Sequence, residues 1–377
     1  MPTNMIAYEW PLKGTSHIAY ETDDTHIHEM VIGQDRKWRD QDITFIADAP
    51  KLEEAILAGF TWEDGHSQQI AYASAINENG HIYELIQPQD LPWRFEDIMK
   101  KCTDAAPADG FALIGYPWKA AGTRHLTYTG RDGHLHELSV AVNGVWSHGD
   151  LTQLTGTPLP ENSLLAAYTW EIGKTKHVVY TSGDGHIHEL TAGVDGTWKQ
   201  TDLTDATDAP LAGDSALTAY AWKAGKTKQV VYIGVNGDVY ELACGQDAVW
   251  IYANLTGLTG APLAIGSALV AYAWETGLAK QVVYVGSNHH IYELQMPLDG
   301  TWEQTDLTQH LGVPEASEDV IAAHEWTPEF AKHIVYLDIT DQPHMHSLML
   351  KHGGNWHHTD LTSSTGSPLI ALLRAGK

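Results

Sequence analysis

Residues 164–210 read LLAAYTWEIGKTKHVVYTSGDGHIHELTAGVDGTWKQTDLTDATDAP, and the rest of the 377-residue chain repeats this unit. Four short runs within it are rich in Val, Ile, Tyr, Trp and Thr. Each run is closed by Gly, Asp or Asn, which is typical of strands joined by tight turns. We predict strand A around Trp170, strand B over 178–180, strand C over 187–190 and strand D over 198–203. No helical periodicity competes with this interpretation.

The tryptophans indicate seven repeats, because all 14 of them fall into two series of seven. The strand A series is Trp10, Trp62, Trp118, Trp170, Trp222, Trp274 and Trp326. Subtraction of neighbouring numbers gives spacings of 52, 56, 52, 52, 52 and 52 residues. The strand D series is Trp38, Trp93, Trp146, Trp198, Trp250, Trp302 and Trp356. A period near fifty residues, in units too short to bury a core alone, indicates stacked or radial repeats.

Seven four-stranded antiparallel units predict an all-β, seven-bladed β-propeller, because radial packing leaves only short, protected strand edges. Strand B alternates poorly between apolar and polar residues, as expected for a blade packed on both faces. A solenoid is the alternative, but both end units keep the full pattern, whereas open stacks usually need polar capping repeats.

The ends of the chain predict how the propeller closes. The chain begins inside strand A, at residues 6–10, and ends with SPLIALL, the segment that precedes strand A in other repeats. We therefore expect the ring to be closed by the chain termini. The whole chain, 1–377, is then one domain with repeats at approximately 1–50, 51–107, 108–158, 159–210, 211–262, 263–314 and 315–377.

Composition excludes several classes of protein. The formal net charge of −26 disfavours nucleic acid and anionic membranes, which are bound by clustered Lys and Arg. The two cysteines, Cys102 and Cys244, stand in non-equivalent places, so no disulfide framework is expected. The start of the chain has no signal-peptide pattern, and no apolar run is long enough to insert into a membrane. We expect synthesis in the cytoplasm, with any release occurring without a classical signal peptide.

Certain polar residues recur as faithfully as the apolar ones. Strand B carries His17, Gln69, His125, His177, Gln229, Gln281 and His333. Strand C carries Glu29, Glu84, Glu137, Glu189, Glu241 and Glu293, with Ser347 in the seventh repeat. Strand D usually ends in Asp-Leu-Thr, as at Asp150, Asp202, Asp306 and Asp360.

The strand B residue is matched by the third residue of the H-x-[HY]-E-L motif in strand C. Repeats with His in strand B have His there, as in His177 with His188, and repeats with Gln have Tyr, as in Gln229 with Tyr240. In five repeats the two are eleven residues apart, which predicts that they lie nearly opposite across a hairpin and touch.

Two interpretations of these pairs stay open. They can be structural hydrogen-bond partners, with the Glu and the Asp of Asp-Leu-Thr satisfying buried donors. Alternatively, H-x-H with a third His opposite resembles a three-histidine zinc site. The metal candidates are His125, His134, His136, His177, His186 and His188. Four copies argue against one catalytic centre, and Gln and Tyr in three repeats argue against a structural metal. We therefore expect no catalytic residue and no cofactor.

The Glu of strand C and the Trp of strand D also have two interpretations. A carboxylate beside an indole suits sugar recognition, because the carboxylate accepts from hydroxyl groups while the ring packs on C–H groups. Packing of blade against blade explains the same residues equally well.

The run HVVYTSGDGHIHEL followed by Trp198 resembles the repeat of fungal and bacterial fucose-lectin propellers, and of related seven-bladed bacterial lectins. The resemblance covers essentially the whole chain. In that family a basic residue before an apolar-Tyr run, a Glu and a Trp line sugar pockets between adjacent blades. It implies these ligand-binding residues here: His17, Glu29 and Trp38; Gln69, Glu84 and Trp93; His125, Glu137 and Trp146; His177, Glu189 and Trp198; Gln229, Glu241 and Trp250; Gln281, Glu293 and Trp302.

The sequence departs from the family at one position in every repeat, because His or Gln replaces the family's arginine. That change weakens the charge-assisted contact to a sugar and puts fucose specificity in doubt. The repeat with Ser347 and the second repeat, with its irregular stretch FEDIMKKCTDAAP, are the sites expected to be non-functional.

Repetition of the same polar residues favours a multivalent carbohydrate-binding protein whose partners are glycans or glycoconjugates. Single sites of about −4 kcal/mol become useful when several bind one surface. The alternatives are a protein-interaction scaffold, which would expose an apolar patch, and a metal-dependent enzyme using the H-x-H histidines. A homo-oligomer is compatible with each of these.

Overall fold

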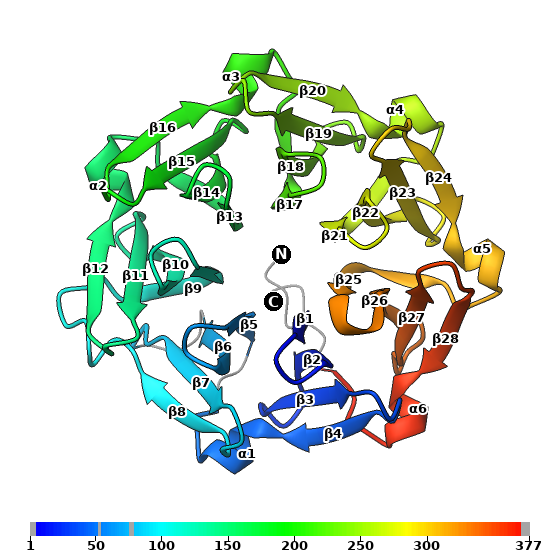
Figure 1. The fold of residues 1–377 in the computed structure, drawn as a ribbon, viewed down its shortest axis with the longest axis horizontal. Helices are drawn as coiled ribbons and strands as arrows, with labels where there is room; N and C mark the ends of the chain where they lie inside the picture. Colours follow the sequence, from blue (N-terminus) through cyan, green and yellow to red (C-terminus); the bar gives the residue numbers. More distant parts are fainter. Residues whose placement is uncertain (1–4, 52–53, 75–78, 371–377) are drawn as a thin grey trace. The chain divides into compact units, whose positions relative to one another are not determined.

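The computed structural model describes residues 5–51, 54–74 and 79–370. The chain is all-β and consists of seven four-stranded antiparallel sheets, in each of which the strands pair in chain order. Each repeat therefore forms one blade, and the predicted seven-bladed β-propeller is confirmed (Figure 1).

The blades belong to two compact units, Leu164–Asp360 and Pro2–Ser163 with Leu361–Lys377. The second of these units holds the first three blades. The first blade is β1 Met5–Trp10, β2 Thr15–Glu21, β3 Ile27–Ile32 and β4 Arg39–Asp42. The second is β5 Ala55–Trp62, β6 Ser67–Ser74, β7 Tyr83–Pro88 and β8 Arg94–Asp97. The third is β9 Ala108–Trp118, β10 Thr123–Gly130, β11 Leu135–Ala141 and β12 Trp146–Asp150.

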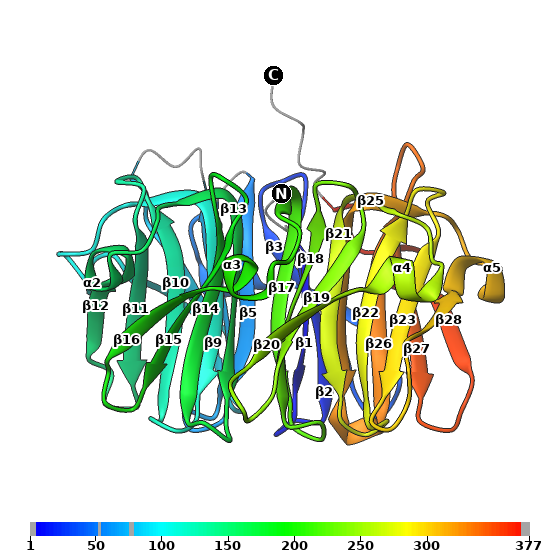
Figure 2. The same ribbon diagram turned by 90° about the horizontal axis from the view of Figure 1, so that it is seen from above.

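The other unit holds the remaining four blades, in each of which neighbouring strands alternate in direction; Figure 2 shows them turned by 90° from Figure 1. The fourth is β13 Pro160–Trp170, β14 Thr175–Ser182, β15 Ile187–Gly193 and β16 Trp198–Asp202. The fifth is β17 Ala212–Trp222, β18 Thr227–Gly234, β19 Val239–Cys244 and β20 Trp250–Asn254. The sixth is β21 Ala264–Trp274, β22 Ala279–Gly286, β23 Ile291–Pro297 and β24 Glu303–Asp306. The seventh is β25 Ala316–Trp326, β26 Ala331–Asp338, β27 Met345–Lys351 and β28 Trp356–Asp360.

Within the described residues, six single-turn helices follow the outer strands, in addition to the predicted strands. They are α1 Ile43–Ala47, α2 Leu151–Thr155, α3 Leu203–Thr207, α4 Leu255–Thr259, α5 Leu307–Leu311 and α6 Leu361–Thr365; a 3₁₀ turn, η1, spans Thr327–Glu329. Asp202 shows the cause, because its side chain accepts a hydrogen bond from Asp205 N and caps α3. Asp208, at φ 55°, ends the helix after one turn. A single turn is too short to leave a helical period in the sequence.

Strand B is the most buried strand of each blade, as its poor alternation predicts. In β14 every residue after Thr175 is buried, and β22 and β26 are buried throughout. A tyrosine in this strand is fully enclosed in every blade: Tyr20, Tyr72, Tyr128, Tyr180, Tyr232, Tyr284 and Tyr336. The hydroxyl of Tyr232 donates to the carbonyl of Pro210, at 2.6 Å, and so ties the linker between blades to the core.

The segment after the last blade returns to the first blade within one compact unit. Ile370 forms an antiparallel bridge with Thr22 and is only 4% exposed. This contact is the one that closure by the C-terminal segment requires, although residues 1–4 and 371–377 lie outside the described residues.

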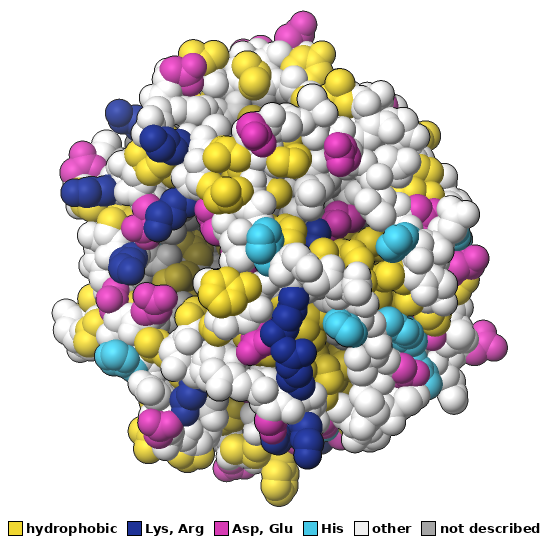
Figure 3. Space-filling model, turned by 45° about the vertical axis from the view of Figure 1, so that its right-hand side comes forward, with side chains coloured by type: hydrophobic (Ala, Val, Ile, Leu, Met, Phe, Trp, Pro, Cys, Tyr) yellow, Lys and Arg dark blue, Asp and Glu magenta, His cyan; other side chains and the backbone are white. Residues whose placement is uncertain are grey.

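The surface carries mixed charge. On the face drawn in Figure 3, Lys and Arg side chains are interspersed with Asp and Glu side chains. Across the described part of the chain, no helix is both long and apolar enough to cross a membrane.

Candidate ligand sites between the blades

The two faces of each blade carry different sets of the repeated residues. In the fourth blade, Glu189 pairs with Thr201 while Ala192 pairs with Trp198. Because neighbouring residues of a strand point to opposite faces, Glu189 and Trp198 lie on opposite faces of their blade. A site that joins His177, Glu189 and Trp198 of one repeat is therefore not what the structure forms.

Glu189 belongs to a buried polar cluster on the first face. The Tyr168 hydroxyl donates to Glu189 Oε1 at 2.5 Å, and His177 Nδ1 lies 3.0 Å from the same oxygen. The Tyr168 and His177 rings stack at a centroid distance of 4.5 Å. In the third blade, Tyr116 contacts Glu137 at 2.7 Å and His125 lies 3.2 Å from Glu137. The predicted strand B and strand C residues therefore do meet.

The predicted contact between the strand B and strand C histidines is wrong. His177 pairs with Thr191, and His188 pairs with Tyr180, three residues further along strand B. The turn after strand B is longer than the prediction assumed, so His177 and His188 lie on opposite faces of the blade. The same holds for Gln229, which pairs with Ala243, and Tyr240, which pairs with Tyr232.

The glutamate of one blade binds a cation from the next blade. Lys228 Nζ, from β18, lies 3.0 Å from Glu189 Oε2, and both side chains are buried. The ammonium lies over two indoles, 4.7 Å from the Trp250 centroid and 5.8 Å from the Trp170 centroid. We call this arrangement an inter-blade site: the strand C Glu and strand A Trp of one blade, with the strand B cation and strand D Trp of the next.

Among the described residues, three further inter-blade sites pair the same Glu and cation positions, two of them with both indoles and one with the strand D indole alone. Arg124 bonds Glu84 at 2.6 Å and lies 4.8 Å from the Trp62 centroid and 5.2 Å from the Trp146 centroid. Lys280 bonds Glu241 at 2.6 Å and lies 4.9 Å from the Trp302 centroid. Lys332 bonds Glu293 at 2.7 Å and lies 4.6 Å from the Trp274 centroid and 5.2 Å from the Trp356 centroid.

The strand B cations belong to the candidate inter-blade sites, and the sequence analysis did not predict them. The residue before the strand B His or Gln is Arg124, Lys176, Lys228, Lys280 or Lys332 in five repeats, and Ser16 or Gln68 in the other two. This column was the available signal, since a repeated cation in an otherwise apolar strand needs a buried anion. The sequence analysis considered only the His or Gln that follows this cation in strand B.

Burial and the neighbouring cations and donors shift the pKa of each glutamate in opposite directions. Burial alone would raise the pKa of Glu189, but the hydrogen bond and charge of His177, with Lys228, bring it down to about 2. Glu241 bonds Lys280 but leaves Oε1 without a partner, and burial raises its pKa. Burial also lowers the pKa of Lys332, even with Glu293 opposite. These ion pairs are thus held in a poorly hydrated environment.

The site between the first and second blades lacks the cation. Glu29 accepts hydrogen bonds from the Tyr8 hydroxyl at 3.1 Å and Gln41 Nε2 at 2.6 Å, and lies 2.8 Å from His17 Nδ1. Among the residues that the structure describes, no Lys or Arg is paired with Glu29. Gln68 occupies the cation's position, but its Nε2 donates to Gln87 Oε1 at 2.7 Å within its own blade.

A cavity of about 390 Å³ lies where the cation is missing. It is lined by Trp10, Lys13, Thr15, His17, Glu29, Val31, Arg39, Asp40, Gln41 and Gln87. The indole Nε1 of Trp10 is buried and has no hydrogen-bond partner in the described structure. The same is true of Trp62, Trp170, Trp222, Trp274 and Trp326, so this buried Nε1 does not distinguish the site. The cavity brings together a buried carboxylate and an indole. A smaller cavity, about 200 Å³, lies beside Trp62, Arg124 and Trp146.

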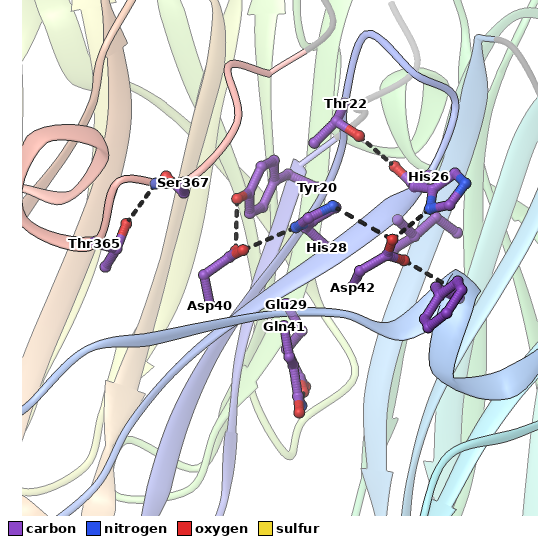
Figure 4. Close-up of polar contacts among 12 residues, drawn as sticks. Tyr20, Thr22, His26, His28, Glu29, Asp40, Gln41, Asp42, Thr365 and Ser367 are labelled. Atoms are coloured by element: carbon purple, nitrogen blue, oxygen red, sulfur yellow. Dashed lines mark hydrogen bonds and ion pairs between the residues drawn. The ribbon is translucent and has the colours of Figure 1, made fainter.

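The other face of the first blade carries a His–Asp network (Figure 4). The Tyr20 hydroxyl donates to Asp40 Oδ1 at 2.7 Å, and His28 Nδ1 lies 2.9 Å from Asp40 Oδ2. His26 Nδ1 bonds the Asp42 carboxylate. Figure 4 shows Glu29 and Gln41 pointing away from this network. The first His of the motif bonds the last Asp of strand D in other blades too, as at His186–Asp202, 2.8 Å.

The candidate histidines of the alternative metal interpretation are not brought together. His125 faces Glu137, whereas His136 lies on the other face of the blade and bonds His148 and Asp132 at 2.9 and 3.0 Å. In the fourth blade His188 bonds Ser182, and His177 again lies across the blade. Within the described residues, one group of three, Asp132, His136 and Asp150, has ligand atoms within 4.8 Å of one another.

The remaining predicted residues have mainly local partners. Gln69 bonds Ser67 at 2.6 Å, Gln229 bonds Thr227 at 2.5 Å, and Gln281 bonds Gln295 at 2.9 Å. Trp93 is buried, and Trp38 is half-buried. None of these residues lines the cavity of the first blade.

Comparison with known proteins supports the fold. No family model matches the sequence, and no curated protein matches it. Among solved structures, the BP39L lectin of Burkholderia pseudomallei has a TM-score of 0.73 at 12% identity, over 94% of this chain and 98% of the lectin. The AofleA protein of Arthrobotrys oligospora has a TM-score of 0.56 at 12% identity, over 80% and 86%.

The fucose-specific lectin of Aleuria aurantia has a TM-score of 0.53 at 13% identity, over 80% of this chain and 93% of the lectin. That lectin has six blades, which fits its coverage of only part of this seven-bladed chain. The predicted resemblance to lectin propellers is confirmed at the level of fold. At these identities, a role for any one residue has to be argued from its own geometry.

Proposed function

We propose that this protein is a carbohydrate-binding protein and not an enzyme. It binds glycans or glycoconjugates between its blades. The observation that carries the proposal is the cavity of the first blade, where the Glu29 carboxylate and the Trp10 indole line one space. A carboxylate accepts from sugar hydroxyls, while an indole packs against the C–H face of the ring. Lectins of the same fold support the proposal.

The inter-blade sites differ in how much they offer a ligand. In the four filled sites the carboxylate is already bound by Lys or Arg, so a sugar would compete with an internal ion pair. The site around Glu29, between the first and second blades, has no Lys or Arg paired with its carboxylate in the described structure, and it has the larger of the two cavities described above. We call it the first-blade site. We infer that it is the principal site, and that the Trp62–Trp146 cavity is a second, weaker one. Two sites on one unit allow a modest gain in avidity.

A glycan array with the purified chain tests the proposal. We expect a defined class of sugars to bind, and Glu29→Gln to reduce binding at least about tenfold, or about 1.4 kcal/mol. Asp42→Asn is the matched control, because Asp42 lies on the opposite face of the same blade and the fifth blade has Asn254 there. The proposal fails if the array is blank, or if Glu29→Gln binds like the wild type.

A further inference from the structure

The filled inter-blade sites indicate what the first-blade site is built to hold. In each of the four, a buried Glu binds an ammonium or guanidinium, and that cation lies within 4.6–5.8 Å of one or two indole centroids. The occupant is supplied by the chain itself. Carboxylate and indole together are a favourable environment for a cation, through a charge-assisted hydrogen bond and a cation–π contact.

The first-blade site retains the anion and the strand A indole but has lost the occupant. Glu29 is fully buried; Tyr8 and Gln41 donate hydrogen bonds to its carboxylate, and His17 Nδ1 lies 2.8 Å from its Oε1. Among the described residues no Lys or Arg is paired with Glu29, whereas Glu189 has Lys228 in addition to its His partner. Burial of a carboxylate has a desolvation cost that a neighbouring cation reduces, so the cavity beside Glu29 is where an external cation would bind most favourably.

We propose that the ligand of this site presents a protonated primary amine to Glu29, so that the recognised glycans contain a non-acetylated hexosamine. The inference rests on the proposed carbohydrate-binding function and names its ligand class. The ammonium would take the place that Lys228 Nζ takes beside Glu189 in the fourth-blade site, with the Trp10 ring beside it. The sugar ring would occupy the rest of the cavity.

Two cations at the rim do not fill the site. Lys13 Nζ is 5.5 Å from the Trp10 centroid, but it is paired with Asp90 at 2.5 Å in an exposed position. Arg39 is exposed and bonds Asp35. Both cations are therefore directed to surface carboxylates and away from Glu29.

Gln41 is the residue that a ligand must compete with. Its amide bonds Glu29 Oε2, whereas the residue at the same place in the register is Gly149, Thr201, Ala253, Thr305 or Thr359 in the third to seventh blades and Glu96 in the second. The Gln41 amide thus supplies a neutral substitute for the missing ammonium. An incoming ammonium would displace it, since the ammonium adds the attraction of opposite charges to its hydrogen bond with the carboxylate.

Calorimetric titration with glucosamine, N-acetylglucosamine and glucose at about pH 6, where such an amine is protonated, tests the inference. We expect glucosamine to bind at least about tenfold more tightly than either neutral sugar, or about 1.4 kcal/mol. Gln68→Lys, which introduces the residue found in the fourth to seventh blades, should abolish binding without lowering the unfolding temperature. Gln68→Met is the matched control and should keep binding. Gln41→Thr should raise the affinity several-fold.

The outcomes separate the inference from the function on which it rests. Glu29-dependent binding of neutral sugars with no preference for the amine overturns the inference and leaves carbohydrate binding standing. Unchanged binding by Gln68→Lys also overturns it, because the amine would then lie elsewhere. Methylamine that binds as tightly as glucosamine, together with a blank glycan array, supports the cation site and rejects carbohydrate as its ligand.

Discussion

Lys228 and Glu189 come from adjacent blades, and their charged groups meet at 3.0 Å with side-chain exposures of 9% and 3%. His177, on the same blade as Glu189, contacts the same carboxylate. The same pairing of a strand C glutamate with the strand B lysine of the next blade recurs at Glu241–Lys280 and Glu293–Lys332.

Removal of one of these cations should destabilise the protein strongly. We expect Lys228→Met to cost about 3–5 kcal/mol of unfolding free energy, because Glu189 would be left buried without its counter-charge. Urea denaturation at neutral pH measures this loss. Lys223→Met, in the exposed turn of the same blade, is the control and should change stability by less than about 0.5 kcal/mol.

A double variant identifies the cause of that loss. Lys228→Met combined with Glu189→Gln removes both charges, and we expect it to be more stable than Lys228→Met alone. Equal stability of the single and double variants would show that packing of the lysine stem against Trp170 and Trp250, and not charge, carries the effect.

The caps of the one-turn helices give a second prediction. Asp202→Ala removes the acceptor for Asp205 N and the partner of His186, and should cost about 1 kcal/mol. Asp202→Asn keeps an acceptor, as Asn254 does in the fifth blade, and should cost less. Amide hydrogen exchange at Asp205 reports the cap directly. Unchanged protection at Asp205 in the alanine variant would contradict the assignment.

The contact of the C-terminal segment with the first blade gives a third prediction. Ile370 is almost fully buried and pairs with Thr22. Ile370→Ala should cost about 2–5 kcal/mol, the usual range for such a truncation in a core. The midpoint of urea unfolding measures it, with the exposed Leu159→Ala as the control. A loss no larger than that of the control would mean that the segment adds little to the unit.

The sequence was sufficient to predict the fold because tryptophan spacing and turn residues repeat seven times, so that each ambiguous strand is read against six others. The face of the blade on which each side chain lies could not be predicted in the same way. Glu189 and Trp198 stand on different faces because Ala192, not Thr191, pairs with Trp198. One residue more or less in the turn would reverse that relationship, and turn length is only approximate in the sequence.

Comparison of the repeats predicted one part of the candidate site, the glutamates, but not the cations. The glutamates were identified as a repeated polar column, and their burial beside His177 or Tyr168 agrees with that prediction. The cation was missed because Lys228 belongs to the next repeat, 39 residues beyond Glu189 in the chain. Pairing residues only within one repeat does not reveal a contact between residues of neighbouring repeats.

The pH dependence of stability should report His333, which is fully buried against Ser347 Oγ at 2.6 Å. Burial lowers its pKa to about 3 in the folded protein, compared with about 6.5 in an unfolded chain. Below about pH 6.5 the unfolded chain therefore takes up a proton that the folded protein does not. Stability should fall as the pH falls, by up to about 1.4 kcal/mol per pH unit from this residue.

Other groups titrate as well, so the prediction is for a difference between two proteins. Hydrogen bonding to Asp150 and Asp360 raises the pKa values of His134 and His344, and their contribution is lost as the pH rises. The contribution of Glu189, with a pKa of about 2, is lost only as the pH falls below the usual range of a glutamate. Both contributions are common to the wild type and to His333→Gln, which carries the residue of the second, fifth and sixth blades. Urea midpoints at about pH 5, 6 and 7.5 should show a shallower decline for the variant, whereas parallel profiles would mean that His333 is protonated in the folded protein.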